Sequence, residues 1–76
     1  MKQEIFDSLL STRPENDFSS SEDFVKDGLL DSLDVVVLVS ELELKFGIKI
    51  PGEDIIAENF SSVDAIEKLL ATLKAP

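Results

Sequence analysis

Apolar side chains recur at steps of three and four residues in several stretches of the chain, and this period predicts helices. The first stretch covers residues 2–11, and Pro14 prevents it from continuing. The last covers residues 62–73, where Ser61 and Asp64 have the spacing of a capping box, with Asp in the position usually held by Glu. Two of the expected helices therefore lie toward the two ends of the chain.

A central stretch, residues 32–46, has two possible interpretations. Its run of Val and Leu at 35–39 is typical of a buried strand, because β-branched residues favour sheets. The total length of the stretch and the spacing of the charged residues that follow the run favour a helix instead. We therefore predict a second main helix that ends before Gly47, a residue suited to the position after a helix.

The segments between the helices differ in length. About twenty residues, 11–31, separate the first two helices, and so long a loop in so small a domain needs anchoring to the core. A shorter helical turn is expected within residues 53–58. The pattern predicts an all-α fold of three main helices and one short helix, with a long first loop whose apolar anchors are Phe18, Phe24, Leu29 and Leu30.

The composition indicates a folded and strongly acidic domain. Hydrophobic residues make up 43% of the 76 residues, too many for a disordered acidic tail, and the length suits one small domain, residues 1–76. Sixteen acidic residues oppose seven basic ones, which gives a net charge of −9. Such a surface repels nucleic acid and anionic membranes, and it attracts basic patches on partner proteins.

The residue types that are missing exclude several kinds of chemistry. The chain has no Cys and no His, so a disulfide framework, a Cys/His zinc site and catalytic triads or dyads built on His or Cys are excluded. Residues 1–4 lack the apolar region of a signal peptide, and no apolar run approaches membrane-spanning length. We expect a cytoplasmic protein without membrane insertion.

The start of the central helix carries the candidate chemistry. A Ser at the head of a helix, here Ser32, most often serves as an N-cap. Its hydroxyl is also exposed there, near the positive end of the helix dipole, where a phosphate ester is favoured. Gly28 gives the preceding loop the freedom to approach the helix. The flanking Asp31 and Asp34 would repel a phosphate, so we interpret them as contacts for a basic partner enzyme.

Three segments of the chain are similar to one protein family. Residues 28–33, Gly-Leu-Leu-Asp-Ser-Leu, resemble the phosphopantetheine attachment motif of acyl carrier proteins and of peptidyl carriers of the D-alanyl type. Residues 43–51 resemble the end of that family's second helix and the loop after it, and residues 59–66 resemble the entry into its last helix. The three segments are in register, and the resemblance covers residues 5–73.

This resemblance implies a small four-helix bundle of acyl-carrier type that acts as a carrier and not as an enzyme. It implies that a phosphopantetheinyl transferase moves 4′-phosphopantetheine from coenzyme A onto Ser32, with Asp31 and Leu33 as the adjoining motif residues. The thiol of the arm, which a chain without Cys cannot supply, holds acyl or aminoacyl cargo as a thioester. The other implied partners are a loading ligase and a downstream synthase or transferase. A diffusing, stand-alone carrier is expected to be a monomer.

The central helix has more apolar residues than a core face needs. On a helical wheel, a second apolar stripe consists of Leu33, Val37 and Leu44, and it begins beside the candidate serine. We predict that Val37 and Leu44 face solvent and dock partner enzymes; the alternative, above all for Leu33, is that the stripe packs under the long loop. The core side of the same wheel comprises Val35, Val36, Val39, Leu42 and Phe46.

The predicted docking face combines apolar and acidic residues: Asp34, Val37, Glu41 and Leu44. Carriers of fatty-acid synthesis have a more acidic face on the corresponding helix, so we favour a specialised carrier for aminoacyl, peptide or polyketide cargo over a fatty-acid carrier. The competing hypothesis from another class of protein is an acidic helical adaptor that binds proteins without any prosthetic group. In that adaptor, Ser32 is only an N-cap.

Overall fold

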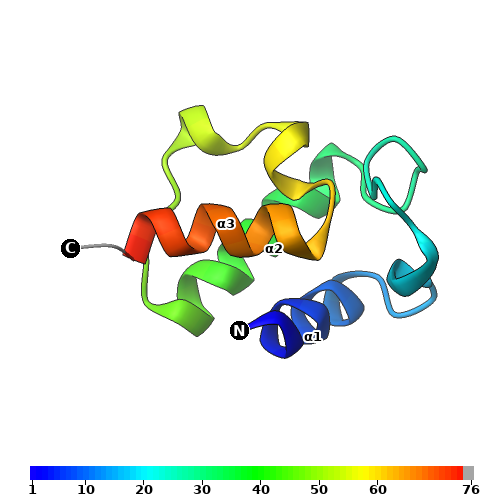
Figure 1. The fold of residues 1–76 in the computed structure, drawn as a ribbon, viewed down its shortest axis with the longest axis horizontal. Coiled ribbons are helices and arrows are strands. Elements are labelled where there is room, and N and C mark those ends of the chain that lie inside the picture. The colour runs from blue at the N-terminus through cyan, green and yellow to red at the C-terminus, as the bar shows by residue number, and fades with distance from the viewer. Residues whose placement is uncertain (75–76) are drawn as a thin grey trace.

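Three α-helices form most of the secondary structure in the computed structural model, which describes residues 1–74 (Figure 1). This described part contains no strand, so the Val- and Leu-rich run is helical, as predicted. None of its helices is long and apolar enough to cross a membrane. The α-helices are α1 (Lys2–Thr12), α2 (Ser32–Phe46) and α3 (Val63–Lys74), and the 3-10 turns are η1 (Phe18–Ser20), η2 (Gly52–Asp54) and η3 (Ala57–Phe60).

The short helix expected within residues 53–58 is instead two separate 3-10 turns, η2 and η3. Between them, the backbone of Ile55 (φ −86°, ψ 73°) and Ile56 (φ −126°, ψ 154°) is not helical. Ile55 packs against the core from a half-buried position in this non-helical segment. The side chain of Asn59 donates a hydrogen bond to the carbonyl oxygen of Asp54 at 2.8 Å and thereby joins the two turns.

Local signals mark where α2 ends and where α3 begins. Gly47 follows α2 at φ +64°, a left-handed conformation that glycine adopts without strain, as the sequence predicted. α3 begins one residue later than predicted, because the hydroxyl oxygen of Ser62 accepts a hydrogen bond from the Ala65 N–H at 3.0 Å. The predicted cap, Ser61, instead donates its hydroxyl hydrogen to a carbonyl oxygen of η3.

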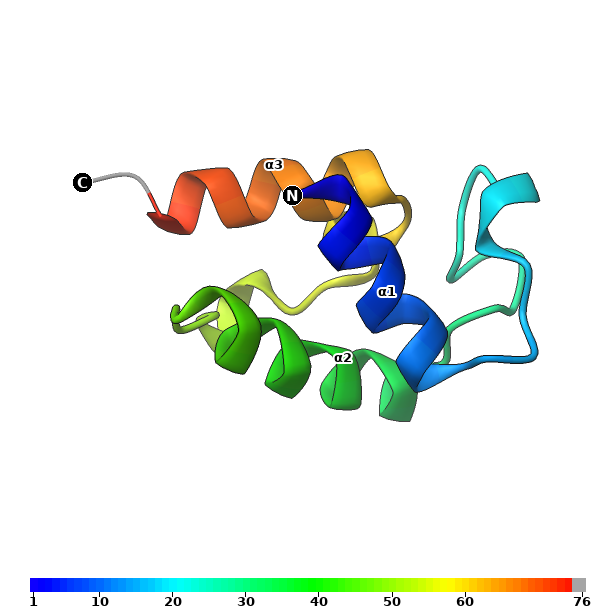
Figure 2. The ribbon, with the colours of Figure 1, turned by 90° about the horizontal axis from the view of Figure 1, so that it is seen from below.

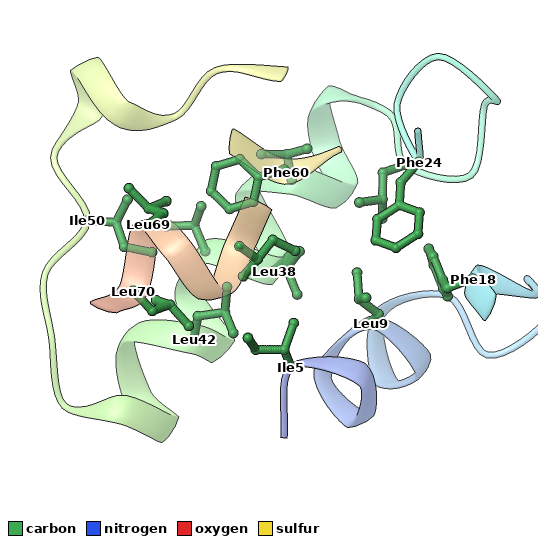
Figure 3. Packing of buried hydrophobic residues seen from close by; sticks show 14 residues of the cluster. Ile5, Leu9, Phe18, Phe24, Leu38, Leu42, Ile50, Phe60, Leu69 and Leu70 are labelled. Atoms are coloured by element: carbon green, nitrogen blue, oxygen red, sulfur yellow. The ribbon is translucent and has the colours of Figure 1, made fainter. Parts of the chain in front are cut away.

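The hydrophobic core lies where the three α-helices meet (Figure 3). Figure 2 shows α1 crossing between α3 and α2, with its first turn near α3 and its last turn near the start of α2. Ion pairs at both ends of α1 agree with this arrangement. The core side chains with no exposed surface are Ile5, Leu9, Leu38, Leu42, Phe60, Ile66 and Leu70.

The long loop between α1 and α2 is anchored to the core, as predicted. Phe18 and Phe24 are each 2% exposed, and their rings meet edge to face with centroids 5.1 Å apart. Leu30 is also buried, and Leu29 packs against the core from a half-buried position. Because Leu30 points into the core, the chain reaches the start of α2 from a fixed direction.

The core face of α2 differs from the predicted wheel at two positions, because the prediction included Val36 and omitted Leu38. Val35, Val39 and Leu42 are buried, and Leu38 between them is completely buried. Val36, which we assigned to the core side, is 57% exposed. The reason is that these four buried side chains occupy one arc of the helix, about 100° wide, and Val36 lies about 60° beyond the edge of that arc at Val39.

Candidate functional site at the start of helix α2

The first turn of α2 is held by a reciprocal capping box. Asp31 is the N-cap residue, and its Oδ1 accepts a hydrogen bond from the Asp34 N–H at 2.9 Å. In return, Oδ2 of Asp34 accepts one from the Asp31 N–H at 3.0 Å. The interpretation of Ser32 as the N-cap is therefore wrong: Asp31 holds that position, and Ser32 is the first residue of the helix.

Ser32 is exposed, and its hydroxyl forms no hydrogen bond within residues 1–74. The N–H groups of Asp34 and Val35 bond to Asp31, to its carboxylate and its carbonyl oxygen respectively. The N–H groups of Ser32 and Leu33, which precede them, have no partner inside the helix because of their position in its first turn. The hydroxyl thus lies beside two unused donors at the positive end of the helix.

The loop that leads into the site has its own hydrogen bonds. Gly28 has φ +79°, a conformation in which an L side chain is strained. After this turn, the N–H groups of Leu29 and Leu30 both donate to the carbonyl oxygen of Phe24, at 2.8 and 3.1 Å. The side chain of Asn16 also donates to the carbonyl oxygen of Leu29 at 2.9 Å. The backbone before Ser32 is therefore held in place from two directions.

Arg13, the residue that follows α1, contacts both carboxylates of the capping box. Its Nε lies 2.8 Å from Oδ1 of Asp34, and its Nη2 lies 3.5 Å from Oδ2 of Asp31. Sequence reasoning missed this residue, since Arg13 is about twenty positions from the helix start and belongs to no motif there. The one available signal was that Arg13 is the only arginine in the chain.

Asp34 does not have the exposure that a docking contact needs. It is only 8% exposed, since its two oxygens are bound to Arg13 and to the Asp31 N–H. Burial raises the pKa of the Asp34 carboxyl, but these hydrogen bonds and the guanidinium charge outweigh burial, so the pKa lies below its ordinary value. The expectation that Asp34 is a docking contact is corrected, because its carboxylate is already bound to Arg13 and to the Asp31 N–H.

The second apolar stripe of α2 is exposed, as predicted for Val37 and Leu44. The exposed fractions are 75% for Leu33, 51% for Val37 and 86% for Leu44, so the long loop does not cover these side chains. Val36 adds to this surface. Glu41 is half-buried beside it, and its carboxylate accepts a hydrogen bond from the Ser11 hydroxyl at 3.1 Å.

Fold and site together define a small helical protein that presents a free serine hydroxyl at the positive end of its second α-helix. The family described as "Phosphopantetheine attachment site" matches residues 3–70, and the chain belongs to this family. The chain is 40% identical over 72 residues to an acyl carrier protein of Wolinella succinogenes, covering 95% of this chain and 91% of that protein.

Two further relatives differ in kind and in coverage. A D-alanyl carrier protein of Lactococcus lactis subsp. lactis is 29% identical over 68 residues, which are 87% of this chain and 86% of the relative. An acyl carrier protein of Helicobacter acinonychis is 50% identical over 48 residues, 63% of this chain and 59% of the relative. No solved structure matches the chain.

The protein is therefore a carrier protein with covalently attached 4′-phosphopantetheine. The first turn of α2 fits such a group, because an exposed hydroxyl without a hydrogen-bond partner lies beside free backbone N–H groups that favour a phosphate ester. Membership of this family removes the basis for the competing hypothesis of an adaptor without a prosthetic group.

Proposed function

We propose that Ser32 Oγ is the attachment point of 4′-phosphopantetheine. The observation that carries the proposal is that Ser32 is exposed in the first turn of α2, where its hydroxyl has no partner in the described part of the chain. Asp31 and Leu33 contribute from either side. Asp31 caps the helix so that the serine need not do so, and the N–H of Leu33 is free to face a phosphate oxygen.

The attached group supplies a thiol, which holds acyl or aminoacyl cargo as a thioester. The chain itself has no Cys to do so and no His to act as a base. Forming the attachment requires a bond from Ser32 Oγ to phosphorus, departure of adenosine 3′,5′-bisphosphate from coenzyme A, and a base for the hydroxyl proton. Within residues 1–74 no side chain forms a hydrogen bond with this hydroxyl, so the base belongs to a separate phosphopantetheinyl transferase and the protein is its substrate.

Partner enzymes dock, in this proposal, on the exposed apolar stripe of α2. Val37 and Leu44 supply apolar contact area, Leu33 extends it to the attachment serine, and Glu41 supplies a charge at its edge. The transferase, a loading ligase and a downstream synthase or transferase would use this surface in turn. We place the exchange in the cytoplasm, where coenzyme A is available, with the carrier diffusing as a monomer.

The attachment is tested by intact mass after incubation with coenzyme A, Mg²⁺ and a broad-specificity phosphopantetheinyl transferase. The expected result is a gain of one phosphopantetheine in the wild-type protein and none in Ser32→Ala. Ser40→Ala is the matched control, because Ser40 is an exposed serine on the same helix, and it should gain the group normally. No gain with several transferases, or a gain in Ser32→Ala, would contradict the proposal.

A further inference from the structure

One guanidinium completes the capping box on which the start of α2 depends. Each of the two carboxylates uses one oxygen for the box and the other for Arg13. Oδ1 of Asp31 accepts the Asp34 N–H, and Oδ2 of Asp31 faces Nη2 of Arg13 at 3.5 Å. Oδ2 of Asp34 accepts the Asp31 N–H, and Oδ1 of Asp34 accepts from Nε of Arg13 at 2.8 Å. All four carboxylate oxygens thus have a partner.

The charges of Arg13 and of the carboxylates around it are unbalanced. Arg13 also lies 3.3 Å from the carboxylate of Glu15, so one cation faces three carboxylates. In the described residues no lysine forms an ion pair with Asp31 or Asp34. Ser32 lies between these two aspartates in the sequence, and a phosphodiester on its hydroxyl adds a further negative charge. Like charges brought this close repel one another, and removing the only cation strengthens that repulsion.

We propose that Arg13 is a positioning residue for the phosphopantetheine attachment: it holds Asp31 and Asp34 in the capping box and offsets their charge, so that the first turn of α2 accepts a phosphodiester. The inference rests on the proposed attachment to Ser32. Arg13 extends from the end of α1, so the same contacts make the charge balance at the serine depend on how α1 packs against α2 (Figure 2).

A purely structural role of Arg13 makes a different prediction. If Arg13 only joined α1 to α2, its loss would destabilise the protein equally with and without the prosthetic group. If Arg13 offsets charge at the attachment site, its loss destabilises the loaded protein more, because only that form carries the additional phosphate charge. The difference between the two losses is a thermodynamic coupling between Arg13 and the group, and a mutant cycle isolates it.

The test measures urea unfolding midpoints of the apo and loaded forms of the wild type, Arg13→Gln and Arg13→Lys. Arg13→Gln is expected to lower the midpoint of the loaded form more than that of the apo form, and added salt should reduce the difference. Arg13→Lys should restore part of it, since a point charge does not reach both carboxylates as a guanidinium does. Lys2→Gln is the matched control: it removes one positive charge from α1, but Lys2 pairs with Asp64 and Glu67 of α3. Equal shifts in the apo and loaded forms of Arg13→Gln would overturn the inference.

A second pair of variants tests Arg13 without any loading. Ser32→Asp places a single negative charge at the attachment position, and Ser32→Asn is its neutral counterpart. Adding Arg13→Gln should lower the urea midpoint of the Ser32→Asp variant more than that of the Ser32→Asn variant. Equal decreases would again overturn the inference. If the wild type gains no mass from coenzyme A, the attachment proposal fails, while this pair still decides whether Arg13 offsets negative charge at residue 32.

Discussion

Asp34 is a charged residue whose role changes between sequence and structure. In the sequence it is one of two acidic residues beside a serine, and its charge suggests a partner-binding role. In the structure it is 8% exposed, closes the capping box with Asp31 and binds Arg13. The ionised form is therefore the one that these contacts favour, and the pKa of Asp34 is lowered although burial opposes this.

The lowered pKa of Asp34 predicts a loss of stability in acid. Because the folded-state pKa lies below the unfolded value of about 3.9, the stabilisation is complete above that value and is lost as pH falls through the folded-state pKa. The urea midpoint of the wild type should therefore fall as pH is lowered from about 6 to about 3. Asp34→Asn should cost about 1 kcal/mol at the higher pH and reduce this dependence.

Asp64→Asn is the control for this pH experiment. Asp64 forms an ion pair with Lys2, but its side chain is 82% exposed, so its substitution should change the midpoint little. If Asp34→Asn and the wild type lose stability in parallel on acidification, the carboxylate of Asp34 does not contribute as described.

At the scale of the helix, α2 has apolar residues on two faces, of which one is buried and the other exposed. Leu42 is completely buried, whereas Leu44, two residues later, is 86% exposed. Two residues correspond to a rotation of about 200° around the helix axis, so the two side chains point in nearly opposite directions. One face supplies the core, and the other leaves a strip of apolar surface that begins at Leu33, beside the attachment serine.

Substitutions at these two leucines should separate stability from docking. Leu44→Glu is expected to leave the free energy of unfolding within about 0.5 kcal/mol, because the side chain has few contacts to lose. The same variant should lower kcat/KM of the transferase for the carrier, mainly through a higher KM. Leu42→Ala should cost roughly 2–5 kcal/mol of stability. A folded Leu44→Glu variant that is loaded at unchanged kcat/KM would show that this stripe does not dock the transferase.

At the scale of the whole molecule, α1 is held by a cation at each end. Lys2 lies 2.9 Å from the carboxylate of Asp64 in α3, and Arg13 binds Asp34 in α2. Both pairs engage basic side chains with the protein's own carboxylates, in a chain whose net charge is −9. The outer surface is therefore strongly acidic, and its field extends toward partners that carry basic patches.

This charge predicts a salt-dependent encounter with the transferase. Raising NaCl from about 0.05 M to about 0.5 M should lower kcat/KM for loading, because screening weakens long-range attraction between oppositely charged proteins. The effect should appear mainly in KM, and a parallel titration with coenzyme A as the varied substrate controls for salt effects on the transferase itself. A loading rate independent of salt would exclude electrostatic steering of this carrier.

The three main helices and the exposed serine follow from the sequence alone. The period of apolar residues located α2 at its observed bounds and α3 to within one residue, and Gly47 marked the end of α2. The exposure of Val37 and Leu44 also followed from the wheel. These features could be predicted because they depend on residues close together in the chain, where helix geometry fixes the relation between neighbours.

The arrangement around Ser32 depends on how distant parts of the chain pack together. The contact of Arg13 with Asp31 and Asp34, and with it the burial of Asp34, depends on where α1 crosses α2 (Figure 2). The same holds for Val36, whose exposure depends on which side of α2 the other helices cover. A local pattern carries no information on such crossings, because they arise from packing between segments that are distant in the sequence.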